Sequence, residues 1–227
     1  MMKNKTMTTK SKKAIIFDLD GVIVDTAKYH FIAWQQIAKK LGINFTHKDN
    51  ELLKGVSRVK SLELILSLGG VNISQAEKDA LLQQKNDHYL QLISDMNDEE
   101  LLPGIKKLLQ NLSDNNIPFA LGSASKNARR ILKALNLTEM FTAIVDGTDV
   151  SKAKPDPEVF LIAAEKLNYN PENCIVIEDS QAGIAAANSV NMFSIGIGDR
   201  QNLFEADLIL EDTSKLNYTL INGLITE

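Results

Sequence analysis

Only one cysteine, Cys174, is present in 227 residues, which excludes an internal disulfide framework. It lies in the apolar run 174–177, which predicts a buried strand, so we expect it to fill the core and not to act as a nucleophile. No Cys/His cluster with zinc-binding spacing is present. No apolar run approaches the roughly 20 residues that cross a bilayer, and we expect no membrane partner.

An excess of basic residues is also lacking. The chain has 25 Lys and Arg against 29 Asp and Glu, a net charge of −4, so we expect no nucleic-acid partner. It has no Walker-type glycine-lysine loop, which disfavours an NTPase. Residues 1–12 carry lysines but lack the apolar segment of a secretory signal. We expect them to be a disordered basic tail and the protein to be cytoplasmic.

What the chain does have, from about residue 103 onward, is an alternation of strand-like and helix-like segments. This alternation predicts an α/β fold, a Rossmann-like, doubly wound parallel sheet with helices on both faces. Ligands of such sheets bind beyond the carboxyl ends of the strands. The predicted strands are 14–17, 117–121, 143–145, 174–177, 193–197 and 206–210.

Residues 26–97 interrupt this alternation, because they contain amphipathic helical segments and no convincing apolar strand. Ser74-x-x-Glu77 has the pattern of a capping box that opens one of these helices. We therefore expect a helical cap domain over the edge of the sheet, inserted between the first two strands. The predicted division is a catalytic core of residues 13–25 plus 98–227 and a cap of residues 26–97.

Two carboxylates follow the first predicted strand in Asp18-Leu19-Asp20-Gly21. Residues two apart on a strand point to the same side, so both carboxylates should emerge together. Such crowded acids repel each other unless a cation or a shared proton intervenes, and Mg²⁺ with oxygen ligands suits the pair. Taken alone, the motif is explained equally well by a strand end followed by an Asp-Gly turn.

Polar residues also follow two other predicted strands. Ser123 comes after strand 117–121, and Glu178-Asp179 comes after strand 174–177. Their common place at one edge of the sheet favours a single site. Lys154, before Pro155, supplies a fixed positive charge there. Taken singly, Ser123 is an ordinary turn residue and Lys154 a solvated one.

Together these residues predict phosphoryl transfer through an aspartyl phosphate. Asp18 is the expected nucleophile, and Asp20 the general acid and base. Ser123 is expected to donate a hydrogen bond to a phosphoryl oxygen, and Lys154 to bridge the carboxylates and the phosphate. The expected Mg²⁺ ligands are Asp18, the backbone carbonyl of Asp20, Asp179 and Glu178.

The order of these residues resembles the motifs of the haloacid dehalogenase superfamily. The resemblance covers nearly the whole chain beyond the tail and implies a Rossmann-like core with a helical cap. True haloacid dehalogenases lack the second aspartate, so Asp20 implies a phosphatase or phosphotransferase. The motifs are Asp18-Leu19-Asp20-Gly21, Ser123, Lys154-Pro155 and Glu178-Asp179-Ser180-x-x-Gly183.

Three further segments, 25–34, 53–58 and 123–127, resemble the β-phosphoglucomutases of that superfamily. This resemblance implies interconversion of β-D-glucose 1-phosphate and D-glucose 6-phosphate through a β-glucose 1,6-bisphosphate intermediate. The same bisphosphate is the expected priming phosphoryl donor. The expected partners are therefore small sugar phosphates, and we expect a monomer.

A mutase must bind two phosphates, whereas a simple phosphatase needs to bind one. The planar guanidinium of Arg58 suits a second, non-reacting phosphate on the cap side. On the core side, the predicted helix start after residue 125 also favours phosphate. The expected substrate-binding residues are Trp34, Lys54, Gly55, Val56, Ser57, Arg58, Ser125, Lys126 and Asn127.

Two residues near the start of the predicted cap, where it joins the core at Asp25-Thr26, are expected to act on Asp20. The resemblance implies that His30 helps to position this acid/base, and Thr26 lies where cap closure would control it. Trp34 shares a helix face with His30, but it is equally a cap-core residue. Lys85-Asn86 resembles a substrate-binding stretch of the cap, or else lies on a solvated helix face.

Two alternatives remain at this stage. A sugar-phosphate phosphatase would use the same Asp18 and Asp20 and release inorganic phosphate from many hexose phosphates. A non-catalytic binding protein on this fold usually lacks a catalytic group, and none is missing from this sequence.

Overall fold

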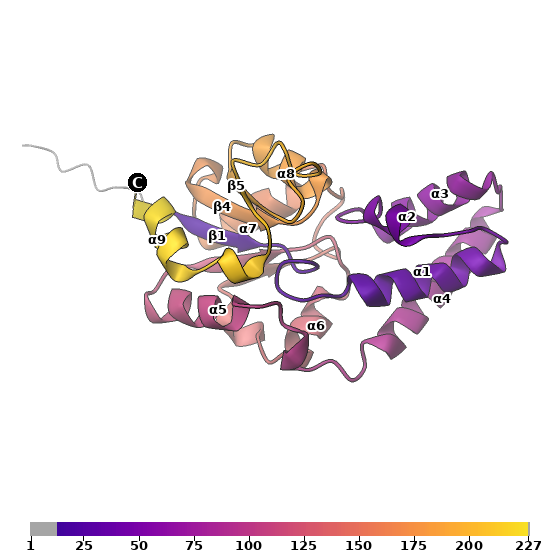
Figure 1. Cartoon of the computed structure of the whole chain (residues 1–227), viewed down its shortest axis with the longest axis horizontal. Helices are drawn as coiled ribbons and strands as arrows, with labels where there is room; N and C mark the ends of the chain where they lie inside the picture. The colour runs from indigo at the N-terminus through magenta and orange to yellow at the C-terminus, as the bar shows by residue number, and fades with distance from the viewer. Residues whose placement is uncertain (1–12, 227) are drawn as a thin grey trace, which may run out of the picture.

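Six parallel strands form one sheet, in the order β3-β2-β1-β4-β5-β6, in the computed structural model, which describes residues 13–226 (Figure 1). β1 is central, and its residue Ile16 lies opposite Ala120 on one side and Val176 on the other. The predicted parallel α/β sheet is confirmed. The strands are β1 (Ala14–Phe17), β2 (Phe119–Gly122), β3 (Ala143–Val145), β4 (Cys174–Glu178), β5 (Phe193–Ile197) and β6 (Leu208–Leu210).

Helices cover both faces of the sheet because the buried residues of β1 alternate between two hydrophobic clusters. Ile15 and Phe17 pack in a cluster with α5, α6 and α9, whereas Ala14 and Ile16 pack in another with α7 and α8. The helices of the sheet layer are α5 (Ile105–Asp114), α6 (Ala128–Ala134), α7 (Glu158–Leu167), α8 (Gln181–Asn188) and α9 (Tyr218–Thr226). Short 3₁₀ turns occupy Asp98–Glu100, Thr138–Met140, Pro171–Asn173 and Thr213–Lys215.

Four helices are inserted between β1 and β2. They bury a hydrophobic cluster of their own that includes Trp34, Ile37, Leu62 and Ile65. Figure 1 shows them as a separate group to the right of the sheet, at the end of the molecule opposite α9. The division at residues 26–97 stays a prediction. The four helices are α1 (Ala27–Lys40), α2 (His47–Glu51), α3 (Arg58–Gly69) and α4 (Gln75–Leu92).

The two chain segments that join this helical group to the sheet lie side by side. Val24 forms an isolated antiparallel bridge with Leu101, and the Asp25 amide donates to the Glu100 carbonyl at 3.3 Å. The Glu100 carboxylate also accepts from the Tyr29 hydroxyl at 2.7 Å. Any movement of the helical group relative to the sheet therefore passes through these paired segments.

The structure differs from the sequence-based expectations mainly in short elements. The second strand runs over 119–122 and not 117–121, and the helices α2 and α9 were not predicted. The capping box at Ser74 and Glu77 is confirmed, with the Ser74 amide donating to Glu77 Oε2 at 2.8 Å. The expected basic tail, residues 1–12, lies outside the described residues. Within residues 13–226 no helix is both long and apolar enough to cross a membrane.

Candidate active site

The polar residues singled out in the sequence come together at the carboxyl edge of the sheet. Asp18 follows β1 directly, Ser123 follows β2, and Glu178 ends β4. β1 lies between β2 and β4, and the strand order reverses at β1 and β4. Such a reversal leaves a crevice beyond the strand ends, which is where doubly wound sheets bind ligands.

Lys154 joins two of these carboxylates in a buried ion triad. Its Nζ donates to Asp18 Oδ1 at 2.6 Å and to Glu178 Oε2 at 2.9 Å. Burial, and then the charge of Glu178, raise the pKa of Asp18 well above its usual value. Burial opposes the charged form of Lys154, but the charges of Asp18 and Glu178 outweigh it and raise its pKa. The one ammonium thus offsets part of the negative charge of the pair.

Glu178 is fully buried and its second oxygen is also engaged. Oε1 accepts hydrogen bonds from the amide and the hydroxyl of Ser180, which is the N-cap of α8. A Cβ on Gly183 would collide with the Glu178 carboxyl group. The spacing Glu178-x-Ser180-x-x-Gly183 is therefore explained by close packing of the α8 N-terminus on one carboxylate.

Asp179 lies against the turn that follows β1. Gly21 has a φ of +82°, and a Cβ there would collide with Asp179 Oδ2, so both backbone and space require glycine. The Nζ of Lys54, from the inserted helical group, lies 3.3 Å from the same oxygen. Burial, and then the charge of Glu178, raise the pKa of Asp179 to about 7.

The three carboxylates form a group that fits a divalent cation. Asp18, Glu178 and Asp179 each offer an oxygen, and these oxygens lie within 4.8 Å of one another. Three carboxylates at the site face the ammoniums of two lysines, Lys154 and Lys54, so the lysines offset only part of the negative charge of the carboxylates. Oxygen ligands with excess negative charge suit Mg²⁺. The side chain of Asp20 is not part of this group among the described residues, and the expected contribution of its carbonyl stays a prediction.

Asp20 is held by the residue that begins α1. The Thr26 hydroxyl donates to Asp20 Oδ1. Thr26 is the N-cap of α1, yet its side chain makes none of the capping hydrogen bonds that a threonine usually makes there. Burial raises the pKa of Asp20, while the Thr26 hydrogen bond and the charge of Lys85 act in the opposite direction. The Thr26 hydroxyl thus binds the Asp20 carboxylate and does not cap α1.

His30 lies next to a buried lysine of α4. Lys85 Nζ lies 2.9 Å from His30 Nδ1, and when Lys85 is charged its ammonium donates to Nδ1, so that the proton of a neutral imidazole is on Nε2. Burial, and then the charges of Lys85 and Arg58, lower the pKa of His30 well below its usual value. His30 Nε2 is buried and has no hydrogen-bond partner within the described residues. It is a donor without an acceptor in this arrangement.

Lys85 itself is 2 % exposed, with its Nζ 5.0 Å from the centre of the Trp34 ring and 4.6 Å from that of Tyr89. Burial, and then the charge of Arg58, lower its pKa to about 7. Trp34 is 2 % exposed and packs in the helical cluster, so the structure favours the cap-core alternative for it. Its substrate role stays a prediction.

Arg58 begins α3 and belongs to the same electrostatic group. Its charge acts on both Lys85 and His30, and within residues 13–226 it forms no ion pair. Arg58, Lys85 and His30 thus form one group of basic side chains on the cap side, and the charge of Lys85 also acts on Asp20. Such an arrangement fits an anion.

The neighbouring loop brings the inserted group against the sheet. A Cβ on Gly55 would collide with Ser180 Oγ, so the 54–57 loop packs on the start of α8. Ser57 is the N-cap of α3, and its Oγ accepts from the Lys60 amide at 3.3 Å. Val56, which lies between Gly55 and Ser57 in the sequence, is half-buried. Lys54 and Gly55 therefore contact the carboxylate site, whereas the Ser57 side chain is engaged in its own helix.

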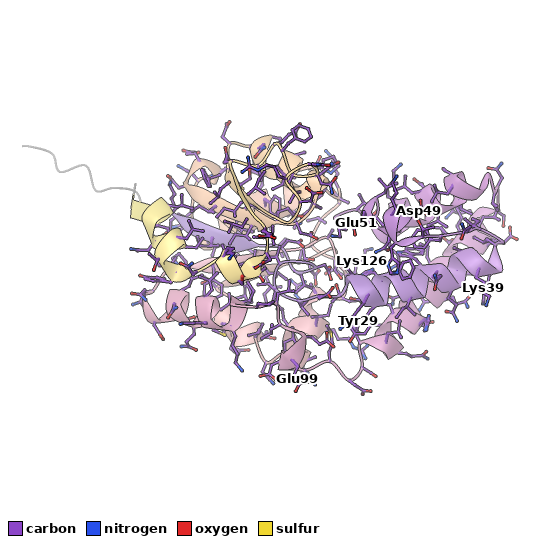
Figure 2. The ribbon with its side chains drawn as sticks, in the orientation of Figure 1. Tyr29, Lys39, Asp49, Glu51, Glu99 and Lys126 are labelled. Carbon is purple, nitrogen blue, oxygen red and sulfur yellow. The ribbon has the colours of Figure 1, made fainter. Side chains whose placement is uncertain are left out.

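On the sheet side, the 123–127 loop is held by hydrogen bonds within itself. Ser123 Oγ accepts from the Ser125 amide at 3.1 Å, and Ser125 Oγ accepts from the Asn127 amide at 3.3 Å. The Asn127 side-chain amide donates to Asn86 Oδ1 of α4 at 3.0 Å, across to the inserted helices. Lys126 is exposed, and Figure 2 places it where the sheet meets the inserted helices.

Three contacts of this site were missed by sequence reasoning. They are Lys85 with His30, Asn86 with Asn127 and Lys54 with Asp179. The stretch Lys85-Asn86 was noticed, but its α4 sequence is mostly polar and also fits a solvated helix face. No local signal identified the carboxylate partner of Lys54.

Comparisons with known proteins agree with this geometry. The pattern of the haloacid dehalogenase-like hydrolase family matches residues 12–191. The chain is 49% identical over 212 residues to a β-phosphoglucomutase of Bacillus subtilis, covering 92% of this chain and 94% of that one. A crystal structure of β-phosphoglucomutase from Clostridium difficile matches with a TM-score of 0.89 and 46% identity, covering 93% and 96% of the two chains. A phosphorylated carbohydrates phosphatase of Thermotoga maritima is 29% identical, covering 87% and 92%.

Proposed function

Because the chain belongs to the haloacid dehalogenase-like hydrolase family, we propose that it works as a β-phosphoglucomutase of that family. The enzyme interconverts β-D-glucose 1-phosphate and D-glucose 6-phosphate. The observation that carries this proposal is the second basic centre. Lys154 contacts Asp18, while Arg58, without an ion pair in the described residues, lies with Lys85 and His30 on the cap side. A mutase binds two phosphates at once, and a simple phosphatase binds one.

In the first half-reaction, Asp18 carries the phosphoryl group as an aspartyl phosphate. The 6-hydroxyl oxygen of β-glucose 1-phosphate attacks the phosphorus, Asp20 accepts the hydroxyl proton, and the bond to the Asp18 oxygen breaks. The products are β-glucose 1,6-bisphosphate and a free Asp18 carboxylate. The raised pKa of Asp20 matches a group that must accept and then return a proton.

In the second half-reaction, the bisphosphate is bound the other way round. Asp18 attacks the 1-phosphate, the phosphorus–oxygen bond to the sugar breaks, and Asp20 returns its proton to the sugar oxygen. Glucose 6-phosphate leaves and the aspartyl phosphate is restored. The free enzyme is primed by the same bisphosphate, which donates a phosphoryl group to Asp18.

The other predicted residues take supporting roles in this proposal. Lys154 and Ser123 offset charge on the phosphoryl oxygens, and Thr26 orients Asp20. His30, whose Nε2 has no hydrogen-bond partner within the described residues, is available to contact Asp20 when the cap closes further. Asp18 and Asp179, with Glu178 and the Asp20 carbonyl, hold Mg²⁺, which when bound offsets the negative charge of the nucleophile and the phosphate. Arg58, together with Ser125, Lys126 and Asn127, binds the phosphate that is not being transferred. Trp34, Lys54, Gly55, Val56 and Ser57 border the sugar from the cap.

Hydrolysis is the competing reaction, since water can replace the sugar hydroxyl. The 29% identity to a phosphorylated carbohydrates phosphatase makes sugar-phosphate hydrolysis the second candidate function. The packing of Gly55 on Ser180 and the Asn86–Asn127 hydrogen bond support a cap that closes on the site and excludes water. A cytoplasmic monomer remains the expectation from the sequence.

The Asp18→Ala and Asp20→Ala variants test this mechanism. With acetyl phosphate as donor, intact-protein mass spectrometry should detect a phosphoenzyme in the wild type and none in Asp18→Ala. Asp20→Ala should still form it, because acetate leaves without a proton, but should lose glucose 6-phosphate formation by ~10²-fold or more. Wild-type turnover in both variants would refute the proposed roles.

A further inference from the structure

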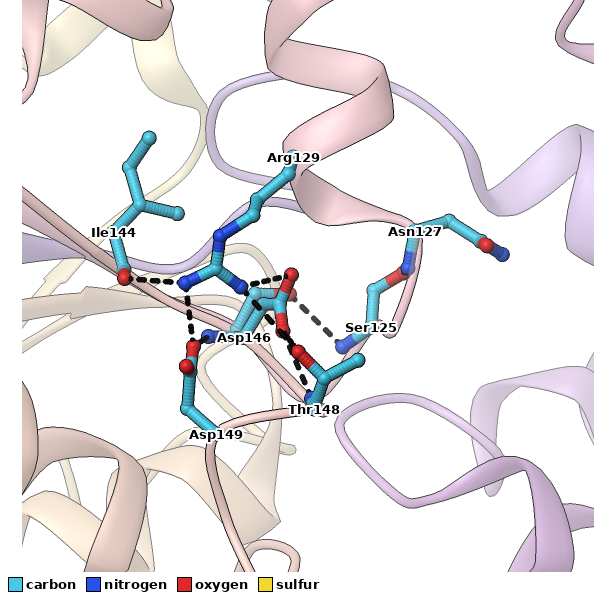
Figure 3. Close-up of polar contacts among 8 residues, drawn as sticks. Ser125, Asn127, Arg129, Ile144, Asp146, Thr148 and Asp149 are labelled. Atoms are coloured by element: carbon cyan, nitrogen blue, oxygen red, sulfur yellow. Dashed lines mark hydrogen bonds and ion pairs between the residues drawn. The ribbon is translucent and has the colours of Figure 1, made fainter.

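The side chain of Arg129 is the centre of a polar network beside the candidate site (Figure 3). Its Nη1 pairs with Asp146 Oδ2 at 2.6 Å, and its Nη2 pairs with Asp149 Oδ2 at 2.7 Å. Nη2 also donates to the Ile144 carbonyl at 3.0 Å. One planar guanidinium thus binds two carboxylates and a strand carbonyl at once. The network ties the first turn of α6 to the end of β3.

The turn formed by residues 146–149 depends on this network. Asp146 is 1 % exposed, and its Oδ1 accepts from the Thr148 amide at 2.8 Å and from the Thr148 hydroxyl at 2.6 Å. The Asp146 amide donates to Asp149 Oδ2 at 2.8 Å. Arg129 provides the ion pair of the buried Asp146, and a buried charge without its partner is costly. The guanidinium therefore fixes the conformation of the turn.

This turn supports the 123–127 loop directly. The Gly147 amide donates to the Ser125 carbonyl at 3.3 Å. A Cβ on Gly147 would collide with the Ala124 carbonyl oxygen and lie 3.0 Å from Lys126 Cγ. Gly147 does not have a positive φ, so the close approach of the loop is what requires glycine there. The position of the turn sets the position of the loop.

We propose that Arg129 is a positioning residue for sugar phosphates: through the 146–149 turn it holds Ser125, Lys126 and Asn127 where they bind the phosphate that is not transferred. The inference rests on the proposed function, since it concerns the second phosphate position. Arg129 is not itself a phosphate ligand, because its guanidinium is occupied by Asp146 and Asp149. It acts on substrate binding and not on the chemistry at Asp18.

Arg129→Met removes every donor and keeps an unbranched side chain, and Gly147→Ala displaces the loop while keeping the ion pairs. Both should raise KM for β-glucose 1-phosphate about tenfold or more, as expected when charged hydrogen bonds are lost. Both should leave the rate of phosphoenzyme formation from acetyl phosphate within about twofold, since the phosphate of that donor contacts Ser123 at the end of β2 and not Ser125, Lys126 or Asn127. Arg129→Lys should recover part of the affinity.

Arg130→Met is the matched control. Arg130 is the next residue of the same helix, is exposed, and its side chain makes no hydrogen bond or ion pair within the described residues. It should behave as the wild type in both assays.

The outcomes separate this inference from the proposed function. A wild type that forms no glucose 6-phosphate would overturn the function itself. A wild type that forms it, with an unchanged KM in Arg129→Met and Gly147→Ala, would overturn only the role of Arg129. Equal losses of activity with acetyl phosphate and with the sugar phosphate would indicate that the Arg129 network only stabilises the fold. If Arg129→Met does not fold, Arg129→Lys decides: an ammonium keeps a positive charge beside the buried Asp146 but lacks the fork that binds both carboxylates, so KM should still rise, and an unchanged KM would overturn the role of Arg129.

Discussion

The ammonium of Lys54 lies 3.3 Å from Asp179 Oδ2, and so connects the inserted helices to the carboxylate group at the edge of the sheet. The same ammonium lies 3.0 Å from Glu51 Oε2. The next residue, Gly55, packs on Ser180. A cation from the cap therefore lies where a metal ion would need the oxygen of Asp179.

Replacement of Lys54 by methionine should strengthen Mg²⁺ binding to the substrate-free enzyme. The metal would no longer compete with an ammonium for Asp179, and loss of this partly exposed ion pair should increase the affinity about fivefold, or ~1 kcal/mol. Calorimetric titration of the substrate-free enzyme with Mg²⁺ measures this affinity. Lys60→Met, which breaks only the surface pair with Glu63, is the control. Weaker binding in Lys54→Met would contradict this prediction.

Lys154→Met should destabilise the protein as well as inactivate it. Loss of the ammonium leaves Asp18 and Glu178 buried without their counter-ion, which costs ~3–5 kcal/mol. The charge of Lys154 lowers the pKa of Asp18, so its loss raises that pKa further and the folded variant binds a proton on Asp18 at a higher pH than the folded wild type. The difference in unfolding free energy between wild type and variant should therefore shrink between pH 7.5 and pH 5.

Urea unfolding of wild type and Lys154→Met at the two pH values checks this. Lys152→Met, which removes an exposed pair with Asp156, should change stability by less than ~1 kcal/mol. If the difference in unfolding free energy between wild type and Lys154→Met stays constant with pH, the unpaired carboxylates of Asp18 and Glu178 are not its cause.

Lys85→Met should stabilise the ligand-free protein most below pH 7. Burial and Arg58 lower the pKa of Lys85 to about 7, whereas an unfolded lysine titrates near its usual value of 10.5. Below pH 7 the folded protein bears the full cost of a buried charge. Between pH 7 and 10.5 the unfolded chain binds more protons, so wild-type stability rises with pH relative to the variant. Urea unfolding from pH 6 to 9.5 should show the difference narrowing, and a constant difference would refute the lowered pKa.

Arg58→Ala should separate binding of the second phosphate from phosphoryl transfer. We expect kcat/KM for β-glucose 1-phosphate to fall ~10- to 100-fold, the effect of losing charged hydrogen bonds. Phosphoenzyme formation from acetyl phosphate should be retained, because that donor has no second phosphate. Arg58→Lys should recover little, since an ammonium lacks the planar fork. Equal loss with both donors would contradict the assigned role.

The sequence predicted the sheet well because its strands are short apolar runs with polar residues at their ends. Asp18, Ser123 and Glu178 could be grouped in advance, since parallel strands bring their carboxyl ends to one edge. The Ser74 capping box was also predicted, because both partners lie within one turn. These features depend on local patterns or on a general rule of topology.

Contacts between distant segments were not predictable in the same way. Lys85 and His30 are 55 residues apart, and a lysine in a polar helix ordinarily indicates a solvated face. Thr26 shows the converse, because it lies only six residues from Asp20 and was expected to act on it, and its hydroxyl does donate to Asp20 Oδ1. Tertiary packing decides which partner Lys85 takes, whereas chain proximity already indicated the partner of Thr26.

The most direct test of the account is to follow two products of the wild-type enzyme at once. β-Glucose 1-phosphate is supplied with Mg²⁺ and a trace of glucose 1,6-bisphosphate, and glucose 6-phosphate and inorganic phosphate are assayed in parallel. The account predicts rapid formation of glucose 6-phosphate, dependent on the bisphosphate, with little release of inorganic phosphate. Rapid phosphate release without glucose 6-phosphate would contradict it and identify the protein as a phosphatase.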